Sequence, residues 1–314
     1  MIARSVRVFA PGAPPRVDEV TLPEPGDSEV LVSLSYAAVN PLDTYAAAGQ
    51  VGDTRRLPRT LGIEGSGYLD GHPVVVQGAG LGMLRDGTWA EAVVVPRACV
   101  YPVPEGVDLA AAAGVPVAGV TALRIVQTVA QVDSSDRVLV LGAAGGVGSI
   151  AVQFAKLTGA AVYAQVGSEA KRDAAAELGA DGVLVSDAAG LVATVADLRP
   201  TVVLDPLGGD FLAAAVELTA VSGRIVSYGV SAGPQTAFSA RTFYRNALRL
   251  LGYAGMRAAP ARAAEGITAV LTAIADGHIR VPVGHVVPLT EIETALTLLR
   301  GRAAIGKIIL DVRS

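Results

Sequence analysis

RVLVLGAAGGVGSIAVQFAK, residues 137–156, contains the signals of a strand, a glycine-rich turn and a helix in immediate succession. The apolar run at 138–142 is typical of a strand that is buried on both faces of a sheet. Beyond the glycines, apolar residues recur with the spacing of one helix face, at Val147, Ile150, Ala151, Phe154 and Leu157. The segment therefore predicts a strand–turn–helix unit of a parallel sheet.

The turn in this unit matches the G-x-G-x-x-G pattern of dinucleotide sites, except that Ala143 stands in place of the first glycine. Gly145 lets the backbone approach a pyrophosphate, Gly148 lets helix and strand pack closely, and the helix N-terminus offers N–H groups to the anion. We expect a cofactor pyrophosphate at Ala144, Gly145, Gly146, Val147 and Gly148. The alternative is a purely steric use of glycine in a tight turn.

Composition and charge argue against several classes of protein. The chain has 314 residues and a net charge of −4, which leaves room for two domains and gives no basic surface for nucleic acid. Its single cysteine, Cys99, excludes a disulfide framework and a multi-cysteine zinc site. The N-terminus has no signal-peptide pattern, and the longest apolar stretch, 109–123, is broken by glycine and proline. We expect a cytoplasmic protein without a membrane span or a nucleic-acid partner.

The two halves of the chain differ in their secondary-structure signals. Residues 5–103 contain mostly strand and turn patterns, with one helical signal at 41–48. From Asp108 onward, strands alternate with short helices, which predicts parallel pairing and a doubly wound sheet. The fold class is therefore α/β. We expect a mostly β domain of residues 1–115, completed by 285–314, and a nucleotide-binding domain of residues 116–284.

The end of the second strand of this sheet indicates which cofactor fits. An acid about 20 residues beyond the glycines usually holds the ribose 2′-hydroxyl of NAD. Here that count reaches Gln165, and the strand end contains no acid. Ser168, Lys171 and Arg172 follow, and a hydroxyl with two cations suits a 2′-phosphate, which favours NADPH. The alternative is that Ser168 only caps a helix, the two cations are solvated, and Glu169 binds a plain ribose.

Nine motifs lie in collinear order over nearly the whole chain: VNPLDTYAAAG (39–49), LGIEGSG (61–67), GTWAEAVVVP (87–96), AAAGVPVAGVTAL (111–123), VLVLGAAGGVGSIAVQFAK (138–156), ELGAD (177–181), VVLDPLGG (202–209), GRIVSYG (223–229) and GKIIL (306–310). Together they resemble the zinc-independent quinone oxidoreductase, or zeta-crystallin-like, branch of the medium-chain dehydrogenase/reductase superfamily. The resemblance is specific for the superfamily and the branch, and much less specific for the substrate.

This resemblance implies a GroES-like catalytic domain in the mostly β part and a Rossmann domain in the nucleotide-binding part. It also implies a homodimer, formed by edge-strand pairing of the two nucleotide-binding domains through residues 248–253. One departure is the hairpin after Gly67, where GYLDGHPVVV is shorter than is usual in the family.

The resemblance also allows a test for zinc. Zinc-dependent members of the superfamily take their metal from a cysteine near the position of Pro41 and from a histidine in a Gly-His-Glu motif. That motif here has Ile63 in place of the histidine. A zinc site needs thiolate or imidazole ligands at fixed spacing, and the three histidines, His72, His278 and His285, do not supply them. We therefore expect no metal.

Three residues match the helix that lines the nicotinamide pocket in the family. The resemblance implies that Asn40 contacts the cofactor or the substrate carbonyl, and that Tyr45 donates a hydrogen bond or a proton. Asp43 lies between them and is a weaker catalytic candidate. The alternatives are a helix cap for Asn40, a solvent-facing side chain for Asp43 and a half-buried ring for Tyr45.

The remaining candidates come from the second half of the chain. Thr121 matches the family threonine near the nicotinamide carboxamide, although its hydroxyl could instead bond within its own helix. Gly229, Gly252 and Tyr253 are expected to approach the cofactor with their backbone. Trp89, the only tryptophan, is expected in the core rather than at a substrate surface.

Three functions are compatible with these residues. Without a Lewis acid, hydride transfer needs an electron-poor acceptor, such as a quinone or an alkene conjugated to a carbonyl. The first hypothesis is therefore an NADPH-dependent reductase of quinones. The second is an enoyl or 2-alkenal reductase that reduces the C=C bond of an α,β-unsaturated carbonyl, as in secondary metabolism. The third is a non-catalytic nucleotide-binding or crystallin-like protein.

Overall fold

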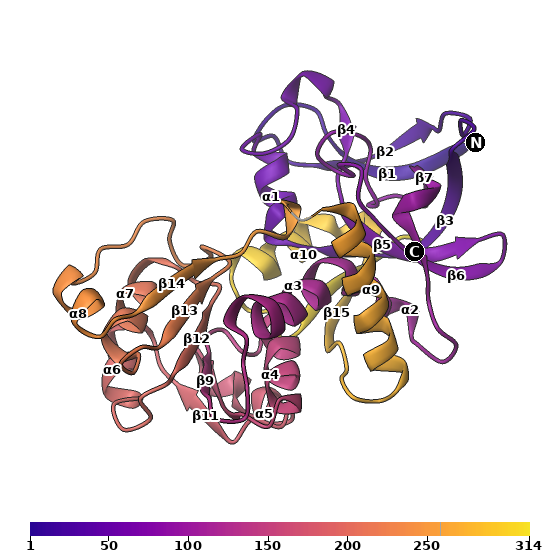
Figure 1. Ribbon diagram of the computed structural model, residues 1–314. Helices are drawn as coiled ribbons and strands as arrows, with labels where there is room; N and C mark the ends of the chain where they lie inside the picture. The colour runs from indigo at the N-terminus through magenta and orange to yellow at the C-terminus, as the bar shows by residue number, and fades with distance from the viewer. Residues whose placement is uncertain (258) are drawn as a thin grey trace. The chain divides into compact units, whose positions relative to one another are not determined.

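The computed structural model describes residues 1–257 and 259–314, and the chain divides into two compact units (Figure 1). Unit 1 contains Met1–Val117 and Ala259–Ser314, and unit 2 contains Ala118–Ala258. Residues 259–284 thus group with the N-terminal part, whereas the sequence placed them in the nucleotide-binding domain. The reason is the helix α9 (Pro260–Ala275), which contacts the strand β8 (Val100–Pro102) of unit 1. An amphipathic pattern predicts that a helix buries one face, not which element covers it.

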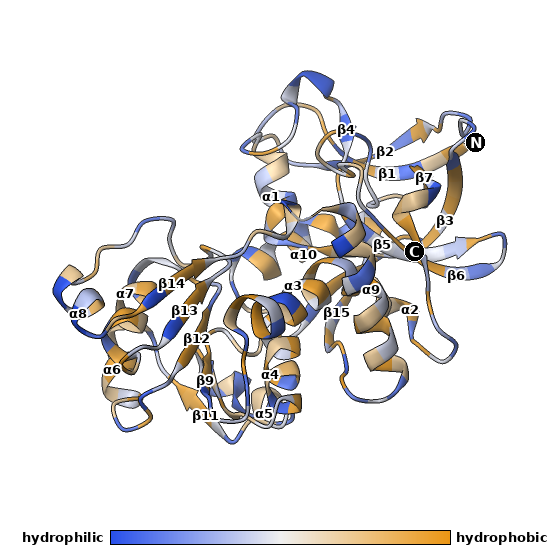
Figure 2. Ribbon diagram, viewed as in Figure 1, coloured by the Kyte–Doolittle hydropathy of each residue, from blue (hydrophilic) through white to orange (hydrophobic). Residues whose placement is uncertain are grey.

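Unit 2 is built around a six-stranded parallel sheet with the strand order β11-β10-β9-β12-β13-β14. The strands are β9 (Arg137–Val140), β10 (Ala161–Val166), β11 (Gly182–Val185), β12 (Val202–Asp205), β13 (Arg224–Ser227) and β14 (Arg249–Gly252). Numbered within the sheet, this is the 3-2-1-4-5-6 order of a doubly wound dinucleotide-binding domain. The central strands β9 and β12 are mostly hydrophobic (Figure 2), and their apolar residues, 138–140 and 202–204, are buried. The predicted Rossmann architecture is confirmed.

The helices of unit 2 are short and lie between the strands along the chain. They are α3 (Val120–Leu123), α4 (Gly148–Leu157), α5 (Arg172–Ala176), α6 (Ala188–Thr194), α7 (Gly209–Leu218) and α8 (Ala240–Arg245). The predicted interruption of the helical stretch 109–129 is confirmed, since α2 (Leu109–Ala112) ends before Gly114 and a π-helical turn follows at Val115–Gly119. Pro116 lacks the backbone N–H that a regular helix would use, which accounts for part of this break.

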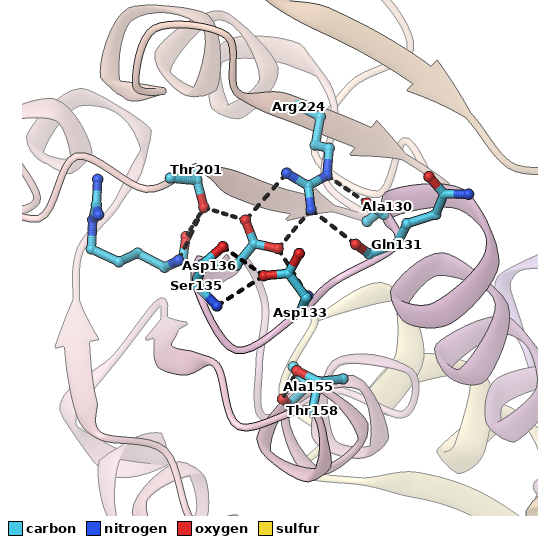
Figure 3. A network of polar contacts seen from close by, with 10 residues as sticks. Ala130, Gln131, Asp133, Ser135, Asp136, Ala155, Thr158, Thr201 and Arg224 are labelled. Carbon is cyan, nitrogen blue, oxygen red and sulfur yellow. Dashed lines mark hydrogen bonds and ion pairs between the residues drawn. The ribbon is translucent and has the colours of Figure 1, made fainter.

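An ion-pair network joins the amino ends of three strands of this sheet (Figure 3). Arg224, the first residue of β13, donates from Nη2 to Asp136 Oδ2 at 2.6 Å, and Asp136 directly precedes β9. Thr201, just before β12, donates from Oγ1 to Asp136 Oδ1 at 2.7 Å. Ligands of open α/β sheets bind beyond the opposite, carboxyl ends of the strands. This network therefore stabilises the sheet and lies away from the edge at which a cofactor is expected.

Unit 1 contains two sheets. The larger has the order β15-β16-β3-β5-β6-β8, with β7 also paired to β3, and the smaller has the order β2-β1-β4. The strands besides β8 are β1 (Ile2–Val8), β2 (Arg16–Thr21), β3 (Glu29–Val39), β4 (Arg59–Thr60), β5 (Glu64–Leu69), β6 (His72–Gln77), β7 (Ala92–Pro96), β15 (Val283–Pro288) and β16 (Lys307–Asp311). The last strand, β16, pairs antiparallel with β3, so the C-terminal segment completes the N-terminal domain, as the sequence predicted.

The helices of unit 1 besides α2 and α9 are α1 (Pro41–Ala47) and α10 (Ile292–Arg300). Trp89 is fully buried in the core of this unit, and its Nε1 donates to the carbonyl of Ala38 at 3.1 Å, which confirms its predicted core position. The shortened hairpin joins β5 and β6 through a two-residue turn, in which Asp70 and Gly71 both have positive φ. This is the turn geometry that the twist of a tight hairpin favours.

The search for membrane-spanning segments gave a negative result in the part of the chain that the structure describes. None of its helices combines the length and the apolar character that crossing a bilayer requires.

Candidate functional site

Three strands of unit 1 bring together a buried polar cluster, which we call the Lys307 cluster. It consists of Asn40 directly after β3, Glu64 at the start of β5 and Lys307 at the start of β16. Because β3 pairs with both β5 and β16, these three positions meet although they lie far apart in the sequence. The side chains of Lys307 and Glu64 are 4% and 0% exposed, respectively.

Hydrogen bonds fix every member of the Lys307 cluster. Lys307 Nζ lies 2.7 Å from Asn40 Oδ1 and 3.3 Å from Glu64 Oε1. Asn40 Nδ2 donates to the same Glu64 oxygen at 2.9 Å, and the backbone N–H of Val117 donates to Glu64 Oε2 at 2.7 Å. A buried ion pair offsets its desolvation cost only when such additional bonds satisfy both charges. The cluster therefore holds the Asn40 amide in one orientation.

A glycine makes room for the lysine. A Cβ atom added at Gly114 would lie 3.0 Å from both Cε and Cγ of Lys307, closer than nearly all real contacts of that kind. Gly114 thus allows the aliphatic part of the lysine to pass the chain just before the π-helical turn. The same glycine marked the predicted break in the helix, so one residue serves both requirements.

Asp43 lies at the third position of α1 and is buried rather than solvent-facing. Its Oδ2 accepts from the backbone N–H of Asn40 at 2.8 Å, whereas its Oδ1 has no partner among the described residues. Burial raises the pKa of Asp43 from 3.8 to about 7; the Asn40 N–H and the Lys307 charge oppose the rise, and Glu64 adds to it. A carboxyl group that changes its charge near neutral pH thus lies beside the Lys307 cluster.

Tyr45 lies on α1, two residues beyond Asp43, and is half-buried. Its hydroxyl makes no hydrogen bond to any residue that the structure describes. A phenolic hydroxyl in that state can donate to a ligand without first breaking a bond within the protein. All three predicted catalytic residues therefore belong to one helix start of unit 1.

The residues present do not fit a catalytic zinc ion. Pro41 and Ile63 have no metal-binding side chain, and both carboxylate oxygens of Glu64 are already engaged. Over residues 1–257 and 259–314, no three His, Cys, Asp or Glu side chains gather as a metal site would require. Zinc needs three or four such donors at about 2 Å.

The glycine-rich turn of unit 2 lies between β9 and α4, at the carboxyl edge of the sheet. A Cβ added at Gly148 would lie 2.5 Å from the carbonyl oxygen of Gly142, so the close packing predicted for this glycine is present. The N–H of Gly145 donates to the carbonyl of Gly142 at 2.9 Å, and α4 begins at Gly148. The turn thus leads directly into a helix N-terminus, whose N–H groups suit an anion.

The end of the second strand, β10, contains no acid side chain. Gln165 instead accepts from the N–H of Gly142 at 2.9 Å and donates to the carbonyl of Ser186 at 2.6 Å. Ser168 is exposed, and its side chain makes no capping bond to the short helix that follows. Arg172 forms an ion pair with Glu169 and donates to the carbonyl of Val183 at 3.1 Å, while Lys171 is half-buried beside it.

The other predicted cofactor residues also lie in unit 2. Gly229 follows β13, where a Cβ would lie 2.6 Å from the carbonyl oxygen of Pro206, so a side chain there would clash with backbone. Tyr253 follows β14, and its N–H donates to Ser227 at 3.0 Å. Its hydroxyl lies near Gly255, as does the Thr121 hydroxyl, and burial raises the pKa of Tyr253 although Arg124 opposes the rise. Gly252 ends β14, and a Cβ added there would meet no atom within 4 Å.

The sequence analysis did not single out Glu64, Lys307 or Tyr228 as site residues. The first two stand in quoted motifs, LGIEGSG and GKIIL, but only the strand pairing shows that they meet. The Tyr228 hydroxyl is buried at the carboxyl edge of the sheet and has no partner among the described residues. Burial, with a further effect from Asp205, raises the pKa of Tyr228. Burying a hydroxyl without a hydrogen-bond partner is energetically costly. In the sequence, the tyrosine of the motif GRIVSYG is the only sign of this group.

Comparison with known proteins places these features in a family. Residues 146–275 match the family of zinc-binding dehydrogenases. Among curated proteins, the chain is 27% identical over 304 residues to a mycocerosic acid synthase-like polyketide synthase of Mycobacterium tuberculosis, covering 92% of this chain and 14% of the synthase. It is 26% identical over 315 residues to quinone oxidoreductase-like protein 2 of Bos taurus, covering 95% of this chain and 89% of that protein.

Solved structures agree with this assignment over the full length. A crystal structure of an NAD-dependent alcohol dehydrogenase is 30% identical, with a TM-score of 0.88 and coverage of 98% of this chain and 99% of that one. A mycobacterial protein in complex with NADPH is 27% identical, with a TM-score of 0.87 and the same coverage. The chain therefore belongs to the medium-chain dehydrogenase/reductase superfamily, in its quinone oxidoreductase-like branch.

Proposed function

We propose that this oxidoreductase uses NADPH to reduce a quinone without a metal ion. The observation that carries the proposal is the Lys307 cluster, which commits both carboxylate oxygens of Glu64 to hydrogen bonds, while Pro41 and Ile63 stand at the positions expected for metal ligands. A site that cannot bind a Lewis acid cannot polarise a simple carbonyl or alcohol through one. An acceptor that is already electron-poor, such as a quinone, needs only orientation and hydrogen-bond donors.

The choice of NADPH rests on the end of β10. Gln165 occupies the place of the usual acid, and its side chain is used to hold the glycine-rich turn and the next strand. Glu169, the nearest acid beyond it, is paired with Arg172. Ser168, Lys171 and Arg172 would then bind the 2′-phosphate, and Ala144, Gly145, Gly146, Val147 and Gly148 the pyrophosphate. The similarity to a mycobacterial protein in complex with NADPH supports this assignment, and the similarity to an NAD-dependent enzyme makes it worth testing.

Bound NADPH would supply the hydride, and the protein would orient the reactants. Asn40 uses one amide N–H and one lone pair of its oxygen in the Lys307 cluster. An amide has a second N–H and a second lone pair, so Asn40 can still contact the nicotinamide or the substrate carbonyl in a fixed orientation. Tyr45 would donate a hydrogen bond or a proton to the reduced oxygen, with Asp43 holding the start of α1. Thr121, Gly229, Gly252 and Tyr253 would border the nicotinamide half of the cofactor.

A second candidate function is reduction of the C=C bond of an α,β-unsaturated carbonyl. The similarity to a polyketide synthase favours it, because building a saturated acyl chain includes such reductions. The same residues would serve, since the carbonyl oxygen of an enone gains negative charge as a quinone oxygen does. For either function we propose a homodimer through β14, which is an edge strand of its sheet.

The test is oxidation of NADPH by the purified protein, followed by its nicotinamide absorbance, with NADH in parallel. The acceptors are 1,4-benzoquinone, 9,10-phenanthrenequinone, a 2-alkenal and an enoyl thioester. Turnover of quinones alone supports the first function, and formation of the saturated carbonyl product supports the second. Loss of turnover on adding a zinc chelator would contradict the metal-free proposal.

A matched pair of variants tests the cofactor assignment. Lys171→Ala should raise the KM for NADPH by about 10-fold or more and leave the KM for NADH nearly unchanged, because only NADPH carries the 2′-phosphate. Lys156→Ala is the control, since Lys156 is paired with Asp181 and belongs to no cofactor candidate. Equal effects of Lys171→Ala on both cofactors would contradict the assignment.

A further inference from the structure

Gln165, near the carboxyl end of β10, is 1% exposed and holds the start of the glycine-rich turn. Its Oε1 accepts from the N–H of Gly142 at 2.9 Å, and its backbone carbonyl accepts from the N–H of Ala143 at 2.8 Å. Its Nε2 donates to the carbonyl of Ser186 at 2.6 Å, just after β11. A backbone N–H requires the amide oxygen and a carbonyl requires the amide nitrogen, so these two partners determine the orientation of the amide.

Gly142 begins the glycine-rich turn and has a φ of +60°. Glycine enters this region of the backbone readily and also leaves it readily, because it has no Cβ. Gln165 binds the N–H groups of the two peptide groups that flank the Gly142 Cα, one through its side chain and the other through its backbone. Holding both peptide groups fixes the dihedral angles of Gly142 between them.

The carbonyl of Gly142 is the point against which the rest of the turn packs. It accepts from the N–H of Gly145 at 2.9 Å, and a Cβ added at Gly148 would lie 2.5 Å from its oxygen. In dinucleotide sites, such glycines let the backbone approach the pyrophosphate and let the helix pack closely on the strand. A rotation of the Gly142 carbonyl would therefore displace both. The side chain of Gln165 thus acts on the expected pyrophosphate site without belonging to it.

We propose that Gln165 is a positioning residue for dinucleotide binding, which fixes Gly142 and so forms the pyrophosphate turn before a cofactor is present. Gly142 then makes the tight turn that the first glycine of the motif, replaced here by Ala143, makes elsewhere. A preformed site loses less conformational freedom on binding than a flexible one. The proposal rests on the proposed cofactor site but not on the choice between NADPH and NADH, because both contain the pyrophosphate.

The test is calorimetric titration of full-length Gln165→Met with NADPH and with NADH. Methionine is unbranched and flexible like glutamine, but it makes neither of the two side-chain hydrogen bonds. The Kd of both dinucleotides should rise by the same factor, about 10-fold. Lys171→Ala, by contrast, should weaken the binding of NADPH alone. With any acceptor that the natural chain reduces, Gln165→Met should raise the KM for the cofactor and leave kcat unchanged, because the pyrophosphate does not react.

Thr201→Val is the matched control at the opposite, amino edge of the same sheet (Figure 3). The Thr201 hydroxyl, like the Gln165 amide, accepts from one backbone N–H, that of Arg137 at 3.0 Å, and donates to one oxygen, Oδ1 of Asp136 at 2.7 Å. Its loss should lower the stability of unit 2, as Gln165→Met does, and leave both Kd values unchanged. Denaturant unfolding measures the stability of each variant and shows that it is folded.

A double-mutant cycle shows whether Gln165 acts through Gly142. Gly142→Ala should also weaken the binding of both dinucleotides, because alanine is strained at a φ of +60°. Both changes disturb the same peptide groups, so their effects should not be independent. The double variant should therefore bind more tightly than the product of the two single effects predicts.

Four results would overturn the proposal: unchanged Kd values in Gln165→Met, an effect confined to NADPH, an equal effect of Thr201→Val, or independent effects of Gln165→Met and Gly142→Ala. Failure of the natural chain to bind either dinucleotide would overturn the proposed function as well. Tight binding by the natural chain that Gln165→Met leaves unchanged would contradict the positioning role alone.

Discussion

Asp43→Asn should remove a pH dependence of stability that a single buried carboxyl creates in unit 1. Burial raises the pKa of Asp43 from 3.8 to about 7, so between those values the folded chain binds a proton that the unfolded chain has lost. This contribution to stability is fully present below about pH 4 and falls by about 1.4 kcal/mol for each pH unit above it. Because the pKa values of the unfolded and folded states differ by about three units, the total loss reaches about 4 kcal/mol by pH 8.

The asparagine variant cannot titrate, so its stability relative to the natural chain should rise by up to that amount as the pH increases from about 4 to about 8. Asparagine has nearly the same shape, and its oxygen can accept from the N–H of Asn40 as the carboxylate does. The other titrating groups are common to both chains and cancel in the difference. The comparison therefore isolates Asp43.

The assay is guanidinium-induced unfolding followed by tryptophan fluorescence at a series of pH values. Trp89 is the only tryptophan and is fully buried in unit 1, so its signal reports the unit that contains Asp43. Asp53→Asn is the control with the opposite sign, because hydrogen bonds from Arg55 lower the pKa of Asp53, and that stability is lost as the pH falls. A stability difference between Asp43→Asn and the natural chain that stays flat over this range would refute the reasoning.

Three further substitutions test the polar clusters and the proton donor. Lys307→Met should lower the free energy of unfolding of unit 1 by about 3–5 kcal/mol, because the Glu64 carboxylate stays buried without its cation. Adding Glu64→Gln to the same chain should restore most of the lost stability, as measured by denaturant unfolding. Arg224→Met should lower the free energy of unfolding of unit 2 by about 2–4 kcal/mol, because Asp136 loses its cation. The loss is smaller than for a fully buried ion pair, since this pair is partly exposed. Steady-state kinetics of the variant should show an unchanged KM for NADPH. Tyr45→Phe should lower kcat for an enone about 100-fold with little change in KM if its hydroxyl donates the proton; an unchanged kcat would assign that proton to water.

Local signals in the sequence were sufficient to predict the architecture of unit 2. Its signals are local: apolar runs of strand length, helical spacing after the glycines, and regular alternation of the two along the chain. Alternation of strands and helices also predicts parallel strands, because each helix connects two strands by crossing one face of the sheet. The glycine-rich turn at 142–148 and the acid-free end of β10 belong to the same local pattern, which is why they could be recognised before the fold was known.

The contacts of the polar side chains in unit 1 depend on the tertiary structure and could not be predicted from the sequence. Asn40, Glu64 and Lys307 lie up to 267 positions apart, and antiparallel pairing of β3 with β5 and β16 is what joins them. Burial of Asp43 and the grouping of α9 with unit 1 follow in the same way from which surfaces face each other. Desolvation and ion pairing depend on neighbours in space, and the pattern of residues along a chain does not specify those neighbours.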